Sequence, residues 1–302
     1  MKLDPAYIFD THTHLMDPKF SGEKEDIIAD LRAHHVQGFT EIGFDLASSR
    51  EAVRLAEHYA ALRQQAVDLH VENVDKMPEV YAAVGFHPEH ADQVNASALA
   101  EIRRLAASPR VVAIGEIGLD YHFTRDAYRK AAELAGREPD PEDLASADPE
   151  PDIQRDSFRQ MLRLARELGK PVNIHSRDAA QDTYDILVAE QGYENSGILH
   201  CFGYSVEMAE RFVKLGMYLG IGGVVTFKNA RKLKEVVEKI PLEHLVLETD
   251  APYMAPTPYR GTRNDPRNLP YIAAAVAEIK KMHPEDVIRI TTENAARVYR
   301  IG

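Results

Sequence analysis

Short apolar segments rich in β-branched residues recur eight times along the chain, and amphipathic stretches follow them. Strands that alternate with helices in this way form parallel βαβ units. Eight such units in 302 residues favour a closed TIM-like (β/α)8 barrel, a fold of about 250 residues in one domain. No G-x-G-x-x-G follows the first segment, which argues against an open dinucleotide-binding sheet. The eight segments are Tyr7–Leu15, Gly38–Leu46, Val80–Pro88, Val111–Asp120, Pro171–Arg177, Gly197–Gly203, Tyr218–Phe227 and His244–Pro252.

Two stretches are longer than a minimal connection, so we expect one barrel domain over residues 1–302 with insertions at 48–78 and 121–152. The first insertion is predicted to be a long helix or a helical hairpin. The second contains the segment 138–152, which has seven acidic residues and four prolines. This composition buries little apolar surface and favours an exposed, mobile segment. A lid or a docking element is the alternative.

Cap residues predict where two of the helices begin. Ser205 can cap a helix that runs to Gly216, and Thr292 can cap the last helix. Hydroxyl side chains at these positions would accept hydrogen bonds from the free N–H groups of the first turn.

The single cysteine, Cys201, excludes an internal disulfide, a cysteine-rich zinc module and a four-cysteine iron–sulfur cluster. We expect Cys201 to be a small core residue, since free cysteines are commonly buried. The first residues lack the apolar run of an export signal, and no stretch approaches the length of a membrane span. A cytosolic protein without a membrane partner is therefore expected. The sequence does not indicate the oligomeric state.

Histidines and carboxylates stand near the ends of five of the eight predicted strands. His12 and His14 are two residues apart, so both point to one face of a strand. By themselves they could equally be two hydrogen-bonded core histidines. The others are Glu116, His175, His200, Glu248 and Asp250. The carboxyl ends of barrel strands form one rim, where active sites of this fold lie.

Imidazole and carboxylate groups together suit zinc, manganese and similar divalent ions. Four histidines and two carboxylates exceed the needs of one tetrahedral site. The set therefore predicts two metal ions that share a bridging carboxylate.

These residues fall in segments that resemble the TatD-type metal-dependent hydrolases, described as deoxyribonucleases, of the amidohydrolase superfamily. The segments span nearly the whole chain: FDTHTHL, GFHPEH, AIGEIGLDY, LGKPVNIHSRDA, ILHCFG, LVLETDAPY, PYRGTRNDP and TTENAARVY. The resemblance implies a TIM-like barrel whose two-metal centre cleaves DNA phosphodiester bonds from a 3′ end. The order Phe202-Gly203-Tyr204-Ser205 departs from the family pattern, in which a small hydroxyl residue and then glycine often follow H-C-F.

The resemblance also implies the role of each site residue. His87, in GFHP, would donate to a phosphate oxygen or to the leaving group; a histidine bonded to backbone is the alternative. Glu248 would orient a histidine or the bound water, or else serve as a capping carboxylate at the rim. Two metal ions, Zn, Mg or Mn, would be held by His12, His14 and Asp250, by His175 and His200, and by Glu116 as the bridge.

Basic residues follow several predicted strands, where a phosphate would arrive. Arg177 lies two residues after His175, and Arg260 lies in the loop after the eighth strand; both are predicted phosphate contacts, because guanidinium groups bind phosphate bidentately. Solvated surface charge is the alternative reading, and it is favoured for the basic residues after the seventh strand, Lys228, Arg231, Lys232 and Lys234. Tyr121 and Tyr253 are candidates for base stacking.

The sequence thus predicts a metal-dependent hydrolase that cleaves DNA, single-stranded or at 3′ ends, with Asp250 as proton acceptor and Glu116 and His87 assisting. A net charge of −12 argues against a broad basic surface for nucleic acid. It mildly favours the alternative, hydrolysis of a small ester, amide or phosphoester, including D-aminoacyl-tRNA deacylation, by the same metal site. A metal-binding scaffold without activity would be favoured only if ligands were missing.

Overall fold

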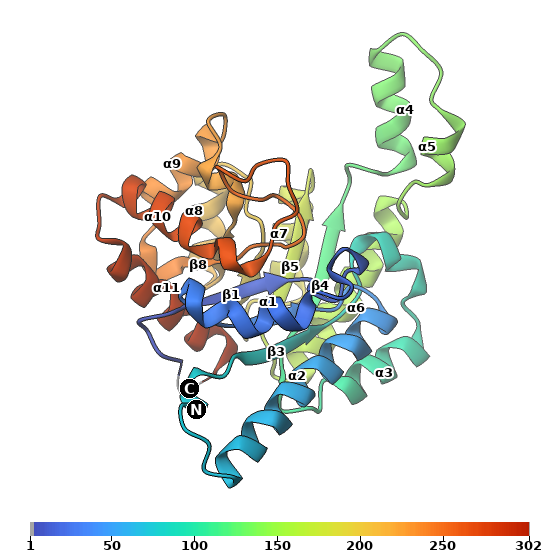
Figure 1. Ribbon diagram of the computed structural model, residues 1–302. Helices are drawn as coiled ribbons and strands as arrows, with labels where there is room; N and C mark the ends of the chain where they lie inside the picture. Colours follow the sequence, from blue (N-terminus) through green and yellow to red (C-terminus); the bar gives the residue numbers. More distant parts are fainter. Residues whose placement is uncertain (1–2, 302) are drawn as a thin grey trace.

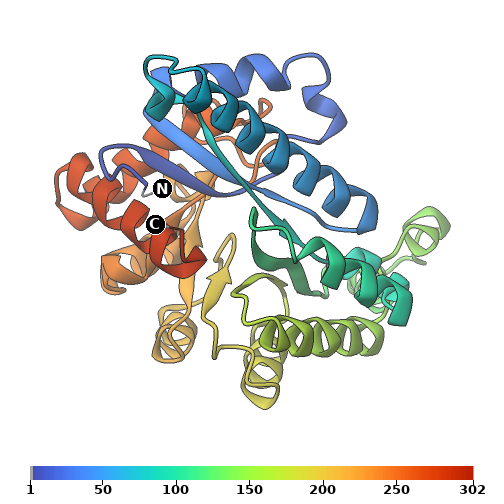
Figure 2. The ribbon, with the colours of Figure 1, turned by 90° about the horizontal axis from the view of Figure 1, so that it is seen from below.

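The computed structural model describes residues 3–301, apart from the side chain of Asp75. Eight parallel strands pair in chain order, and helices surround them (Figure 2), which confirms the predicted TIM-like (β/α)8 barrel. The strands are β1 (Ile8–Thr13), β2 (Val36–Ile42), β3 (Glu79–Val84), β4 (Val111–Asp120), β5 (Val172–Arg177), β6 (Gly197–Leu199), β7 (Tyr218–Ile221) and β8 (Leu245–Leu247).

The main helices lie outside the strands (Figure 1). They are α1 (Lys24–Asp30), α2 (Leu46–Asp68), α3 (Ala96–Leu105), α4 (Arg125–Leu134), α5 (Pro141–Ala145), α6 (Pro151–Glu167), α7 (Ala180–Ala189), α8 (Val206–Lys214), α9 (Arg231–Lys239), α10 (Leu269–Lys280) and α11 (Pro284–Tyr299). Within residues 3–301, none of them has both the length and the apolar composition needed to cross a bilayer.

The first and last strands meet through contacts that set the position of the site. The backbone N–H of Asp250 donates to the carbonyl of His12 at 2.9 Å, and that of His14 donates to the carbonyl of Ala251 at 2.9 Å. The fully buried Asp10 carboxylate accepts bonds from the backbone N–H and the hydroxyl of Thr249. Burial raises the pKa of Asp10 to about 8, against the opposing effect of these bonds. The end of β1 is thereby aligned with the segment after β8.

The strands are buried on both faces, as expected for a parallel sheet covered by helices. Every residue of β1, β2, β3 and β4 is buried. One apolar cluster joins Phe9, Tyr81 and Val246 of the strands to Tyr299 of α11. The Tyr299 hydroxyl donates to the carbonyl of Thr11 at 2.8 Å. Helix α11 lies left of centre in the view from below (Figure 2), and its Ala295 and Val298 join the same cluster.

The long segment after β2 is one 23-residue helix, α2, and not a hairpin. Asp45 caps it: its carboxylate accepts from the backbone N–H of Ser48 at 2.7 Å. Residues Ala52, Val53 and Ala56 are buried in the core. Helix α2 therefore covers the barrel in the second βα unit.

The segment after β4 forms a helical hairpin, α4 and α5, which projects from the barrel (Figure 1). A bridge between Thr124 and Asp148 closes its base, where the backbone N–H of Asp148 donates to the carbonyl of Phe123 at 3.0 Å. Ala132 is the one buried residue of α4, and α5 has none. The acidic stretch 138–152 thus includes α5 and the first residues of α6, and none of its residues is fully buried.

Candidate metal centre

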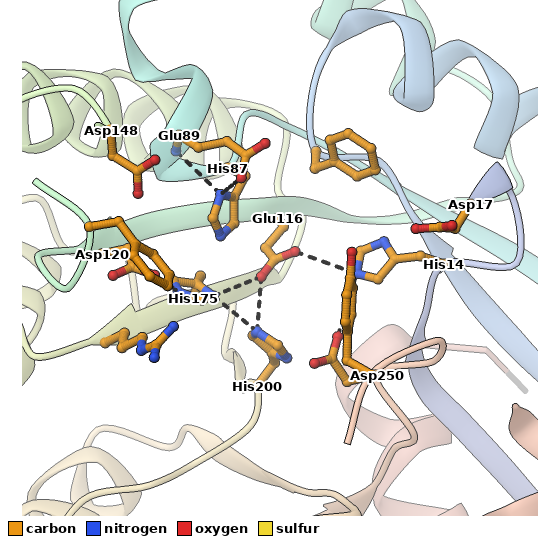
Figure 3. Close-up of a pocket in the computed structure, with 14 residues that line it drawn as sticks. His14, Asp17, His87, Glu89, Glu116, Asp120, Asp148, His175, His200 and Asp250 are labelled. Carbon is orange, nitrogen blue, oxygen red and sulfur yellow. Dashed lines mark hydrogen bonds and ion pairs between the residues drawn. The ribbon is translucent and has the colours of Figure 1, made fainter. Parts of the chain in front are cut away.

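The predicted ligands converge at the carboxyl rim of the barrel, and Figure 3 shows all of them except His12. Glu116 lies in β4 and His175 in β5, whereas His200 directly follows β6 and Asp250 lies three residues beyond β8. Each therefore lies within a strand or no more than three residues beyond its end. Strands β2, β3 and β7 contribute none of the predicted ligands.

The Glu116 carboxylate lies between two pairs of histidines. Its Oε1 is 3.0 Å from His175 Nδ1 and 2.9 Å from His200 Nε2. Its Oε2 is 3.5 Å from His12 Nε2 and 3.7 Å from His14 Nε2. One oxygen thus faces each pair, which is the arrangement that a bridging carboxylate requires.

The donor set fits metal ions better than hydrogen bonds within the protein. The Nε2 atoms of His12 and His14 are 3.2 Å apart, and so are His175 Nδ1 and His200 Nε2. Two nitrogens bound to one tetrahedral zinc at ~2.0–2.1 Å would be about 3.3–3.4 Å apart. Asp250 Oδ1 lies 3.6 Å from His14 Nε2 and 3.9 Å from His12 Nε2, on the side of the first pair.

The opposite ring nitrogens of three of these histidines face oxygen atoms. His14 Nδ1 lies 2.9 Å from the carbonyl oxygen of Ile42, and His175 Nε2 lies 3.0 Å from Asp120 Oδ2. His200 Nδ1 is 3.6 Å from Glu248 Oε1. When the outer nitrogen donates its proton to such an oxygen, the inner nitrogen keeps a lone pair for a metal. Asp120 was missed by the sequence analysis, although it lies in the segment AIGEIGLDY that carries Glu116.

The electrostatics of the centre are dominated by Glu116. Burial tends to raise the pKa of Glu116, but the charges of His200 and His12 outweigh it and hold the pKa well below its usual range. Burial lowers the pKa of His14, yet the bond to Asp250 and the charge of Glu116 raise it to about 9. Protons therefore compete with metal ions for these histidines, so metal affinity should fall at low pH.

His87 lies beside the second histidine pair. Its ring centroid is 4.4 Å from that of His175, and its Nδ1 accepts from the backbone N–H of Glu89 at 3.2 Å. Burial and the charge of His175 lower the pKa of His87 to about 4. The ring is therefore neutral at pH 7, with Nε2 as its N–H donor.

A cavity of about 440 Å³ opens above the ligands. Arg177, Phe123 and Tyr253 line it, and the Arg177 guanidinium lies 4.7 Å from the centroid of the Phe123 ring. Arg260 is outside this lining; its guanidinium stacks 4.4 Å from the centroid of Phe227.

Of the two tyrosines proposed for base stacking, only one lines the cavity. Tyr253 is 48% exposed and lines the cavity. Tyr121 is outside the lining, because its hydroxyl is held by Asp182 at 2.7 Å. Phe123, two residues further along, takes the place at the cavity wall that was expected of Tyr121.

The comparison with protein families decides the relationship of this chain. The family described as TatD related DNase matches residues 9–300. The chain belongs to the TatD family.

Relatives of this TatD family member carry the same assignment. The metal-dependent hydrolase YabD of Bacillus subtilis is 38% identical over 295 residues, covering 98% of this chain and all of YabD. A protein named 3′-5′ ssDNA/RNA exonuclease TatD from Escherichia fergusonii is 31% identical over 300 residues, covering 98% of this chain and all of the relative. The solved TatD homologue YjjV of Escherichia coli covers 99% of this chain and all of its own, at a TM-score of 0.80 and 26% identity. The chain is therefore a metal-dependent hydrolase of the TatD family.

The sixth loop of this TatD family member differs from expectation at Cys201. The residue has a left-handed backbone, with φ of 46°, and its N–H donates to the Glu248 carboxylate. This turn directly after β6 ends the strand alternation, so the side chain does not enter the core. Cys201 is partly exposed, and its Sγ lies 3.7 Å from Met254 Sδ. The prediction of a small core cysteine is wrong.

Proposed function

We propose that this protein is a deoxyribonuclease that hydrolyses single-stranded DNA from a 3′ end with two divalent ions. One observation carries the proposal: the Glu116 carboxylate lies between two histidine pairs at the floor of an open cavity. The family description and the exonuclease name of the Escherichia fergusonii relative support the substrate.

The residues that would hold the ions, Zn, Mg or Mn, form two groups about Glu116. His12, His14 and Asp250 lie on one side, and His175 and His200 on the other. Divalent ions in such a centre act as Lewis acids toward phosphoryl oxygens and lower the pKa of water to ~7.

The protein itself supplies proton transfer and charge. Burial tends to raise the pKa of Asp250, but the bond to His14 and the charges of His200 and His12 outweigh burial and lower the pKa below its usual value. The carboxylate is therefore ionised and can accept a proton from the attacking water. Neutral His87 donates its N–H to a phosphate oxygen or to the leaving group. Arg177 binds a phosphate at the cavity wall.

Two further residues complete the arrangement. Glu248 is fully buried; its carboxylate lies 3.6 Å from His200 Nδ1 and accepts a bond from the backbone N–H of Cys201. It orients His200 rather than touching substrate. The exposed ring of Tyr253 offers a face for stacking a base, an interaction worth ~1–3 kcal/mol per base.

A second candidate is hydrolysis of a small ester, amide or phosphoester, including D-aminoacyl-tRNA deacylation, at the same centre. The observation that favours it is the acidic wall of the cavity, where Asp17, Glu89, Asp120 and Asp148 accompany one arginine. Such a wall repels a chain of phosphates and tolerates a neutral or cationic group.

One assay separates the two. The protein is reconstituted with excess Zn²⁺ or Mn²⁺ and given 5′-labelled single-stranded DNA, the same DNA blocked with a 3′ phosphate, and a panel of small esters and phosphoesters. A ladder shortening from the 3′ end, with higher kcat/KM than for any small substrate, supports the nuclease. Turnover of the panel without DNA cleavage overturns it.

A further inference from the structure

Two more cavities continue from the metal centre along the rim. The first, of about 570 Å³, shares Arg177, His200 and Tyr253 with the metal-centre cavity. The second, of about 550 Å³, shares Cys201 and Gly203 with the first. Residues Cys201–Gly203, in the loop after β6, therefore form a ridge between these two cavities, which we call the saddle.

The second of these cavities, which we call the far cavity, is lined by positive charge, whereas the metal-centre cavity is lined mainly by carboxylates. Arg231 and Lys232, at the start of α9, are its only charged lining residues. Both side chains are exposed. Four acidic residues that are not proposed metal ligands line the metal-centre cavity. The cavity between them is lined by Arg177 together with Asp178 and Asp250. The net charge of the lining therefore becomes more positive from the metal centre toward Arg231 and Lys232.

These cations are also free of carboxylate partners. Within residues 3–301, neither Arg231 nor Lys232 takes part in an ion pair. Two arginines of the loop after β8 are instead held by carboxylates: Arg263 pairs with Glu23 at 2.8 Å, and Arg267 pairs with Asp265 at 2.9 Å. In a chain of net charge −12, unpaired cations side by side are available to an anionic ligand.

Arg260 belongs to the same side of the molecule. It stacks on Phe227, which directly precedes Lys228, and the β8 loop is tied to this segment where the backbone N–H of Thr257 donates to the hydroxyl of Thr226 at 2.8 Å. Helix α9 stands at the upper left in Figure 1 and the α4–α5 hairpin at the upper right. The basic residues therefore lie away from the acidic extension.

We propose that Arg231 and Lys232 form a second phosphate-binding site for a single-stranded nucleic acid whose scissile bond lies at the metal centre. The strand passes over the saddle at Cys201–Gly203. This inference rests on the proposed nuclease function and adds the path of the strand. A single strand fits because its phosphates are spaced along a flexible backbone and can follow a groove lined by separated cations.

Two kinds of variant test the path. Arg231→Ala with Lys232→Ala removes the distal cations, and Arg54→Ala with Arg289→Ala is the matched control, because it removes two exposed cations of α2 and α11. Gly203→Tyr fills the saddle: a Cβ there meets no atom nearer than 3.9 Å, the carbonyl oxygen of Cys201. Gly203→Ala controls for the loss of glycine.

Each variant is assayed on thymidine oligonucleotides of two to twelve residues and on bis(4-nitrophenyl) phosphate. For the distal double variant, KM on the twelve-residue strand should rise about tenfold, with the dinucleotide and the small diester unchanged. The salt slope of binding, measured by fluorescence anisotropy in an Asp250→Asn background, should become about 1.4 shallower, since two phosphate contacts are lost. Gly203→Tyr should abolish the gain in kcat/KM with length, whereas Gly203→Ala and the control pair should retain it.

The possible outcomes distinguish a failure of the proposed strand path from a failure of the proposed nuclease activity. If the unmodified protein cleaves DNA but the distal variant keeps its KM and salt slope at every length, the path is wrong and the nuclease stands. If no nucleic acid is cleaved but the anisotropy still depends on Arg231 and Lys232, the nuclease is wrong and the site stands. Displacement of the oligonucleotide by polyglutamate of equal charge would overturn the assignment to nucleic acid.

Discussion

The metal centre and the α4–α5 hairpin both adjoin β4, yet the first is buried and the second is exposed. Glu116 is 4% exposed and lies where β4 steps out of register with β5. Its backbone N–H donates to the carbonyl of Gly43 at 2.8 Å. The hairpin has ten residues in α4 and five in α5, of which only Ala132 is buried. A fully buried aliphatic or Phe side chain contributes ~1.5–3 kcal/mol, so the hairpin adds little to stability.

This contrast shows where a change in sequence should affect chemistry and where it should not. Rim side chains lie within strands or no more than three residues beyond their ends, so the barrel fixes where they point. The hairpin reaches the site only at its base, through Phe123 and Asp148. Large effects are expected at the rim, intermediate ones at this base, and small ones along the hairpin.

The largest effect is expected for Asp250→Asn. The amide keeps the size of the side chain but cannot accept the proton of the attacking water, so kcat should fall by about 10³-fold. Circular dichroism and melting temperature should stay unchanged. Asp17→Asn is the matched control, because Asp17 lines the same cavity outside the ligand set; equal losses in both variants would remove Asp250 from proton transfer.

A smaller loss is expected for Asp120→Asn. Its carboxylate lies 3.0 Å from His175 Nε2 and fixes which nitrogen of that ring faces the metal. Removing such a partner typically costs 10–100-fold in metal affinity. Titration of the metal-free protein with Zn²⁺ measures the change, with Asp182→Asn as the control, because Asp182 bonds Tyr121 outside the cavity. Unchanged affinity would mean that His175 is oriented by other contacts.

The base of the hairpin should respond to pH. Partial burial, and then the charge of Asp120, raise the pKa of Asp148 from 3.8 to about 6. A raised carboxyl pKa means that the folded state binds more protons, so stability falls as pH rises from about 4 to 6. Asp148→Asn removes this cost and should stabilise the protein at pH 7 by up to about 1 kcal/mol, reduced from the full shift because the group is partly exposed.

Urea unfolding at pH 7 and pH 4.5 checks this expectation. The gain from Asp148→Asn should shrink at the lower pH, and Glu138→Gln, on the exposed part of the same segment, should show no such gain. A stabilisation that is equal at both values would exclude the carboxyl as its source.

The smallest effect is expected along the hairpin itself. Replacing residues 125–147 by a short Gly/Ser linker keeps Phe123 and Asp148 at the base and should shift the melting temperature by less than about 2 °C, since surface loops tolerate changes in length. A larger drop would show that the hairpin packs more tightly than its exposure indicates. Unchanged stability with altered preference among oligonucleotides would indicate that it acts as a lid.

Residues on strands were predictable because the barrel repeats a regular geometry. The pair His12 and His14, and the separate strand ends of Glu116, His175 and His200, were brought together as expected, since parallel strands deliver their carboxyl ends to one rim. Ser205 also caps α8, its hydroxyl accepting from the backbone N–H of Met208 at 3.4 Å.

Residues outside the regular elements were placed less well. Thr292 was expected to begin the last helix but lies inside α11, with its hydroxyl bonded to the carbonyl of Tyr7, and the helix starts at Pro284. Arg260 lies in the long irregular connection between β8 and α10, where no periodicity tells which way a side chain points. Asp120 required the position of His175 on the neighbouring strand, which sequence spacing alone does not provide.

The number of metal ions per chain tests the two-metal centre most directly. After removal of metal and reconstitution with excess Zn²⁺ or Mn²⁺, mass spectrometry of the dialysed protein should find two ions per chain, and Glu116→Gln should lower the count because its carboxylate faces both histidine pairs. A count of one that Glu116→Gln leaves unchanged, or no bound metal, would contradict a centre bridged by Glu116.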